Sequence, residues 1–113
     1  MLIKSFTLKC GAKYIGEYKN DQPHGIGTVS YSDGLKYSGL WRDGQPDGQG
    51  TLTYEDETKY VGDIENRQPN GYGRMTFRDG AEYIGGWKNG QPHGHGILVR
   101  ANGSATTGVF DEM

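Results

Sequence analysis

The chain has 113 residues, a formal net charge of −2 and a hydrophobic content of only 33%. A charge so close to neutral leaves no electrostatic footprint for nucleic acid, which argues against a nucleic-acid-binding protein. The low hydrophobic content would favour disorder, but aromatic residues and glycines recur at fixed spacing, which favours a repeat protein of one domain, 1–113.

Three features bear on location. The single Cys10 allows no intrachain disulfide, which fits a reducing compartment. No apolar run approaches the roughly 18 residues of a membrane-spanning helix, and residues 1–8 lack the basic start and apolar centre of a signal peptide. We therefore expect a soluble, cytoplasmic protein.

The repeats divide the chain from end to end. Half a repeat occupies residues 1–13, whole repeats follow at 14–36, 37–59, 60–82 and 83–105, and a second half-repeat occupies 106–113. Each whole repeat opens on Tyr-x-Gly and later carries Gln-Pro-x-Gly-x-Gly. A fixed period of 23 residues indicates one structural unit per repeat, and such units are stable only when stacked on their neighbours.

Each repeat is predicted to form two short strands. In residues 37–41 the side chains of Tyr37 and Trp41 fall on one face and that of Leu40 falls on the other. Residues 50–54 alternate in the same way. Proline or glycine interrupts every window long enough for a helix, so no helix is expected.

Turn signals stand between these strands. Asp43-Gly44 separates the two strands of a repeat and Asp33-Gly34 separates two repeats; such dipeptides favour tight hairpins in which both central residues have positive φ. Where Asp21, Arg67 and Glu57 replace the turn glycine, we expect looser turns. The sequence thus predicts an all-β fold, a single-layer antiparallel β-meander of about ten strands in one open, elongated or curved sheet about 45 Å long.

Aromatic side chains line up in columns on one face of this sheet. The columns are Tyr14, Tyr37, Tyr60 and Tyr83; Tyr18, Trp41, Ile64, Trp87 and Phe110; and Leu8, Tyr31, Tyr54 and Phe77. By alternation, Gly16, Gly39, Gly62 and Gly85 lie between the first two columns. Because a glycine leaves room for a ring to lie flat on the backbone, we expect these glycines to act as sockets for the rings.

The pattern Tyr-x-Gly-x-(aromatic)-x-(Asn/Asp)-Gly-x-x-(His/Asp/Asn)-Gly-x-Gly resembles the MORN repeat, a β-hairpin of about 23 residues, in four copies across 14–105. The resemblance implies a rod-like or curved single-layer sheet with no catalytic centre. It also implies protein–protein interaction, self-association or scaffolding, and in some relatives an accessory role on a lipid kinase or methyltransferase.

Exposed aromatic residues mark interaction surfaces, and a one-layer sheet leaves part of its aromatic face uncovered. We therefore expect a partner protein to lay a helix or extended segment along this face. The predicted partner-binding residues are Tyr14, Tyr18, Tyr31, Tyr37, Trp41, Tyr54, Tyr60, Phe77, Tyr83 and Trp87.

Two other functions stay open. A phospholipid or membrane-surface adaptor would use the basic residues of the opposite face, Lys13, Lys19, Lys36, Arg42, Lys59 and Lys88. Acidic residues share that face, and stable membrane attachment usually needs a polybasic cluster or an inserted apolar element. The half-repeats at the two ends raise the other function, an accessory domain of a larger enzyme.

The ends of the sheet offer a route to self-association. The strands at 5–9 and 106–110 are complementary half-repeats with unpaired edges. Open strand edges recruit strands from other chains, so end-to-end homo-oligomers are expected.

Other motifs have structural interpretations. Gly25-x-Gly27 lacks the helix that a dinucleotide site requires, so no cofactor is expected. His24 and His93 fill one repeat position far apart, and His93 with His95 gives too few ligands for zinc, so no metal is expected. The acidic run at 55–57 has no convergent partner for acid–base catalysis, and we expect no enzyme activity.

Overall fold

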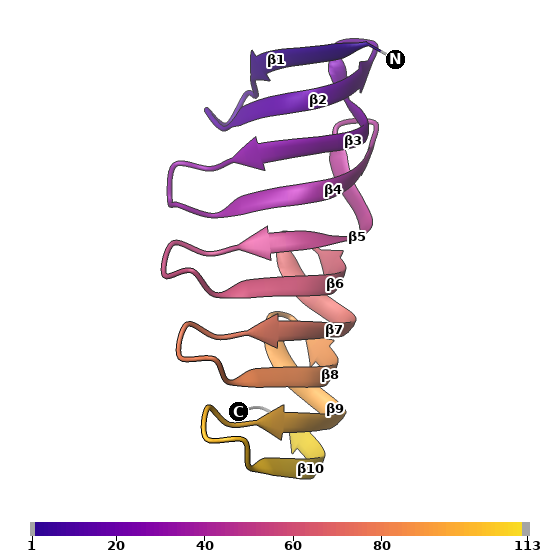
Figure 1. The fold of residues 1–113 in the computed structure, drawn as a ribbon. Coiled ribbons are helices and arrows are strands. Elements are labelled where there is room, and N and C mark those ends of the chain that lie inside the picture. The colour runs from indigo at the N-terminus through magenta and orange to yellow at the C-terminus, as the bar shows by residue number, and fades with distance from the viewer. Residues whose placement is uncertain (1, 112–113) are drawn as a thin grey trace.

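A computed structural model describes residues 2–111 as one antiparallel sheet (Figure 1). Its strands follow each other in chain order: β1 (Ile3–Thr7), β2 (Lys13–Lys19), β3 (Gln22–Ser30), β4 (Lys36–Arg42), β5 (Gln45–Thr53), β6 (Lys59–Glu65), β7 (Gln68–Thr76), β8 (Glu82–Lys88), β9 (Gln91–Val99) and β10 (Ala105–Asp111). The predicted antiparallel meander in a single sheet is confirmed, and the described residues contain no helix.

The turns inside the repeats have the predicted geometry. Asp43 and Gly44 have φ of 50° and 87°, so both central residues of the β4–β5 turn are left-handed. Asp21 and Arg67 stand where other repeats have glycine, and they adopt the same conformation with φ of 60° and 64°. The looser turns expected at these two residues are therefore not seen.

The loops between repeats differ from the prediction. Tyr31 donates its backbone N–H to the carbonyl oxygen of Leu35 at 2.9 Å, and Gly34 donates to that of Tyr31 at 3.2 Å. Only the glycine is left-handed, with φ of 93°. Asp33 instead accepts the backbone N–H of Leu35 at 3.1 Å through its carboxylate, so the aspartate fixes the loop by its side chain.

The sheet bends along its length. In the β4–β5 pair Gly39 lies opposite Gly50, but Trp41 lies opposite Pro46, so β5 has two extra residues at this point. The hairpins β2–β3, β6–β7 and β8–β9 have the same irregularity. Extra residues in one strand bend it and increase its twist.

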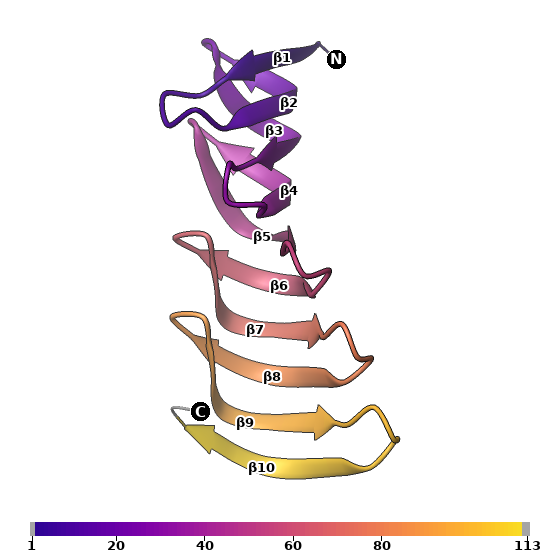
Figure 2. The ribbon, with the colours of Figure 1, turned by 90° about the vertical axis from the view of Figure 1, so that its left-hand side faces the viewer.

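The bends turn the sheet into a trough. The molecule measures 47 × 24 × 23 Å, whereas a flat layer of strands is only about 10 Å thick. Figures 1 and 2 show the strands stacked along the long axis and curving from front to back. The length agrees with the predicted 45 Å; the depth means that the sheet covers its own inner face.

The inner face holds the core. The rings of Tyr37 and Trp41 are 1% and 3% exposed, and equivalent burial is found for Tyr14, Tyr60, Tyr83 and Trp87. Tyr37 donates its hydroxyl to the carbonyl oxygen of Leu40 at 2.8 Å, so the polar end of the buried ring is satisfied. The other three tyrosines make the same bond to the carbonyl three residues later.

The rings rest mainly on a different glycine from the predicted one. A β-carbon at Gly50 would lie 2.5 Å from Cε1 of Tyr37, whereas Gly39 mainly approaches the backbone of Gly50 across the strand pair. Tyr14, Tyr60 and Tyr83 also lie against the second glycine of their hairpin, which is Gly27, Gly73 and Gly96. Each hairpin thus needs two paired glycines: one on which the tyrosine ring lies, and one that lets the two strand backbones come close together.

The strand pattern recurs in every repeat, but the packing of tryptophan against tyrosine recurs only every two repeats. Trp41 stands edge-on to Tyr14 and Tyr37, with both ring centroids 5.3 Å away. Trp87 stands in the same way between the rings of Tyr60 and Tyr83. In the first and third repeats Tyr18 and Ile64 stand at the tryptophan position. The residues just before them, Glu17 and Asp63, accept the backbone N–H groups of Ile26 and Tyr72 with their carboxylates.

Candidate functional site

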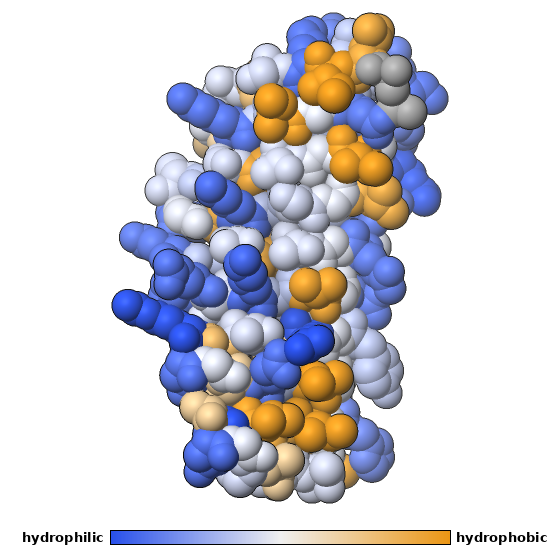
Figure 3. All heavy atoms as spheres, in the orientation of Figure 1, coloured by the Kyte–Doolittle hydropathy of each residue, from blue (hydrophilic) through white to orange (hydrophobic). Residues whose placement is uncertain are grey.

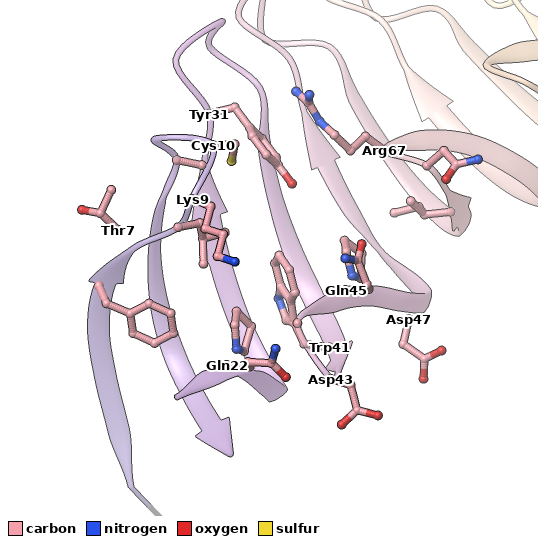
Figure 4. A pocket seen from close by; sticks show the side chains of 18 of the residues that line it. Thr7, Lys9, Cys10, Gln22, Tyr31, Trp41, Asp43, Gln45, Asp47 and Arg67 are labelled. Carbon is pink, nitrogen blue, oxygen red and sulfur yellow. The ribbon is translucent and has the colours of Figure 1, made fainter. Parts of the chain in front are cut away.

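The open side of the trough forms a groove of about 1080 Å³ in the N-terminal half of the molecule (Figure 4). One wall comes from the β1–β2 and β3–β4 loops, and the other comes from the turns of the β2–β3, β4–β5 and β6–β7 hairpins. Trp41 contributes to the lining between them. Two further hollows, of about 600 and 760 Å³, lie at the next loops between repeats. Neighbouring hollows share lining residues, and we call the series of three hollows the groove.

The predicted partner-binding residues fall into two groups. Six of them are buried and belong to the core: Tyr14, Tyr37, Trp41, Tyr60, Tyr83 and Trp87. The remaining four, Tyr18, Tyr31, Tyr54 and Phe77, are half-buried. Because a buried ring offers little surface to a second molecule, the half-buried rings are the part of the predicted set that a partner can reach.

The mouth of the groove is predominantly acidic, a feature that the sequence analysis missed. Its lining includes Asp21, Asp33, Asp43, Asp47 and Glu65, against two basic residues, Lys9 and Arg67. Asp33 lies in a loop, where its carboxylate accepts the backbone N–H of Leu35, and Asp21 and Asp43 lie in tight turns with positive φ. Three of these acidic residues, Asp33, Asp43 and Asp47, are visible in the sequence as Asp-Gly dipeptides. The bend that brings the acidic residues together at one opening could not be predicted from alternation.

One cationic side chain crosses the groove. Arg67, in the β6–β7 turn, places its guanidinium carbon 3.8 Å from the ring centroid of Tyr31, in the β3–β4 loop. Its Nη2 atom donates to Oδ2 of Asp33 at 3.1 Å. Figure 4 shows Arg67 and Tyr31 pointing toward each other across the opening. The contact joins the two walls.

The pKa values of this cluster follow from its contacts. The backbone N–H of Leu35, followed by Arg67, lowers the pKa of Asp33, so its carboxylate stays charged. Burial raises the pKa of Tyr31 although Arg67 opposes the change. The cluster is thus a neutral ring beside an ionised carboxylate, an arrangement that suits a guanidinium group.

The outer face carries the residues predicted for lipid binding. The side chains of Lys13, Lys19, Lys36, Arg42, Lys59 and Lys88 are all exposed. The outer face also exposes apolar side chains: Leu40, as alternation predicted, and others that include Ile15, Ile26, Val61 and Ile84. Figure 3 shows one face of the molecule, with apolar patches spread along its length among polar side chains.

The histidine position serves the turns. His24 accepts the backbone N–H of Asp43 on Nδ1 at 3.3 Å, and Asn70 accepts that of Asn89 on Oδ1 at 3.1 Å in the equivalent place. The described residues contain no group of three or more His, Cys, Asp or Glu that is arranged to hold a metal ion. Within residues 2–111 no helix is long and apolar enough to cross a membrane.

The sheet has two free edges. The first strand covers residues 3–7 rather than 5–9, and the last covers 105–111 rather than 106–110. Among the residues that the structure describes, each pairs with one neighbour, β1 with β2 and β10 with β9.

Stacked hairpins that share one aromatic core and leave a groove open define a β-repeat protein of the solenoid type. The family model described as MORN repeat matches residues 14–36, 37–59, 60–82 and 83–105, and the chain belongs to the MORN-repeat family. No curated protein matches the chain. Repeats of this family are generally associated with protein or membrane interaction, and membership indicates an interaction module.

Proposed function

We propose that the chain is a non-enzymatic interaction or scaffolding module that binds a helix or extended segment of a partner protein in the groove. The observation that carries the proposal is the row of half-buried rings at the loops between repeats, Tyr31, Tyr54 and Phe77. Half-buried rings combine apolar contact area with low loss of side-chain entropy, as interface residues do.

The length of the molecule supports a linear partner. The molecule is 47 Å long, which corresponds to about 14 residues of an extended chain or about 30 residues of an α-helix. A cytoplasmic location remains part of the proposal, and the exposed free thiol of Cys10 supports it.

Photocrosslinking at single positions tests the proposal. A photoreactive phenylalanine analogue at Tyr54 probes the groove, and the same analogue at Leu40 probes the outer face. We expect the Tyr54 variant to crosslink one contiguous segment of a partner, mapped by mass spectrometry, and the Leu40 variant to give no such product. Crosslinks from Leu40 alone would contradict binding in the groove.

A phospholipid-surface adaptor is the second candidate, and a specific observation favours it. Ile26 and Ile15 are 65% and 57% exposed on the same outer face as the lysines. Apolar and basic side chains together bind anionic membranes better than either kind alone. Sedimentation with phosphatidylserine vesicles tests this function: binding that is lost in Lys36→Glu and Lys59→Glu would support it.

A further inference from the structure

Three loops between repeats share an arrangement of a ring and a carboxylate. They are Tyr31 with Asp33, Tyr54 with Asp56, and Phe77 with Asp79. In each loop Oδ1 of the aspartate accepts the backbone N–H two residues later, from Leu35, Thr58 and Ala81 at 3.1, 3.0 and 2.9 Å. The loops therefore hold ring and carboxylate in one geometry. We call these pairs the first, second and third seats.

The first seat is occupied by an arginine of the same chain. Arg67 stacks on the Tyr31 ring and donates to Oδ2 of Asp33, the oxygen that the loop backbone does not use. This contact is an intramolecular example of what the arrangement binds. An arginine fits it better than a lysine does, because a planar guanidinium stacks on a ring and pairs with a carboxylate at once.

The second and third seats hold no cation among residues 2–111. No cation–π contact there involves Tyr54 or Phe77, and no ion pair involves Asp56 or Asp79. The pKa of Asp56 is lowered mainly by hydrogen bonds from the N–H and hydroxyl of Thr58, and the charge of Arg78 is the smallest of its causes. Both rings border hollows at the surface, and the hollow beside Phe77 and Asp79 is also lined by Arg78 and Arg100.

A glycine explains why the second seat is open. Gly90 stands 23 residues after Arg67, at the same position of the next repeat, and it lines the same hollow as Tyr54 and Asp56. It brings no side chain that could cross the groove. The seat therefore faces space that a second molecule can enter.

We propose that the second and third seats bind arginine side chains of the partner segment in the way that Arg67 binds the first seat; this rests on the proposed function. Consecutive loops are two strands apart, or about 9.6 Å. A polyproline-II segment returns to the same face every three residues, after about 9.3 Å. The partner segment is therefore of the form Arg-x-x-Arg in an extended, polyproline-II conformation.

A synthetic peptide, acetyl-Pro-Arg-Pro-Pro-Arg-Pro-amide, is the probe, and the citrulline peptide of the same sequence is its neutral control. Amide NMR signals of Thr58 and Ala81 report on the two seats because these groups bond to Asp56 and Asp79. We expect both signals to move to saturation with the arginine peptide and to stay in place with the citrulline peptide.

Variants assign the effect to each seat. Asp56→Asn and Asp79→Asn keep the loop, since Asn102 accepts the N–H of Ser104 at 2.9 Å in the corresponding loop. We expect each to weaken peptide binding about fivefold, in keeping with exposed ion pairs and cation–π contacts.

Two further variants change the occupancy of the seats. Gly90→Arg supplies the second seat with its own arginine, so the Thr58 signal stops responding while the Ala81 signal still moves. Arg67→Ala empties the first seat, so the Leu35 amide begins to respond.

Equal responses to arginine and citrulline peptides would show binding in the groove without arginine seats, which overturns this inference and leaves the proposed function standing. No response of any groove amide also overturns the inference, and the Tyr54 crosslink then decides the proposed function separately.

Discussion

The indole N–H of Trp41 donates a hydrogen bond to the carbonyl oxygen of Gly27, 3.1 Å away on the neighbouring strand. Trp87 makes the same bond to Gly73 at 3.2 Å. Both tryptophans come from even-numbered repeats, and each lies edge-on between the tyrosines of two repeats. One tryptophan therefore ties each pair of hairpins together.

This tie predicts the cost of losing the indole nitrogen. Trp41→Phe keeps an aromatic ring but leaves the buried carbonyl oxygen of Gly27 without its partner and opens a small cavity. We expect the free energy of unfolding to fall by about 2–3 kcal/mol, measured by urea denaturation. The matched control is Tyr72→Phe at a side chain that is 68% exposed, which should change stability by less than about 0.5 kcal/mol. Equal effects of the two substitutions would show that the tie contributes nothing.

The contact of the Tyr37 ring with Gly50 predicts a steric cost of substituting this glycine. A methyl group at Gly50 meets Cε1 of Tyr37 at 2.5 Å, so Gly50→Ala must displace a buried ring. We expect a loss of about 1–3 kcal/mol from overpacking, together with a changed near-ultraviolet circular dichroism spectrum of the aromatic residues.

A control separates this clash from backbone strain. Gly103→Ala meets no atom within 4 Å but has φ of 91°, so it introduces strain without a clash. We expect it to lower stability without changing the aromatic spectrum. A Gly50→Ala protein with an unchanged aromatic spectrum would contradict the contact between Gly50 and the Tyr37 ring.

Alternation and turn dipeptides predicted the meander because both follow from local backbone chemistry. Tyr37 and Trp41 point inward and Leu40 points outward as period two requires. The bend was not predictable, since it needs two extra residues in β5 between Gly50 and Pro46, and a repeat spacing alone does not reveal which strand carries them.

The same limit applies to the candidate site. The row of Tyr31, Tyr54 and Phe77 was correctly placed on one face, but the burial of Tyr37 and Trp41 depends on the trough, which only the bend creates. The contact of Arg67 with Tyr31 joins segments three strands apart, and nothing in the local sequence indicates it.

One loop is predicted to become more stable by substitution. Glu57 has φ of 75° at the position that Gly34 and Gly80 fill in other loops. Glu57→Gly relieves a left-handed conformation that costs a non-glycine residue about 1 kcal/mol. We expect the midpoint of urea unfolding to rise. The reverse change, Gly80→Glu, meets no atom near its β-carbon and should lower stability by a similar amount through strain alone. A lower midpoint for Glu57→Gly would mean that the side chain stabilises the loop through its charge.

The buried tyrosines predict how stability depends on pH. Burial, followed by the charge of Asp47, raises the pKa of Tyr37 to about 12, and burial also raises the pKa of Tyr60. A tyrosine in the unfolded chain ionises near pH 10, so the unfolded state loses its protons first as the pH rises. The contribution of these hydroxyls to stability is therefore fully present below about pH 10 and is lost as the pH rises to about 12. Urea unfolding between about pH 8 and pH 11 should give constant stability at the lower values and a steep fall above pH 10.

Tyr37→Phe should be less stable at neutral pH, because it lacks the bond to Leu40, and should lose less stability on the alkaline side. An alkaline fall of the same size in this variant would assign the pH dependence to other groups.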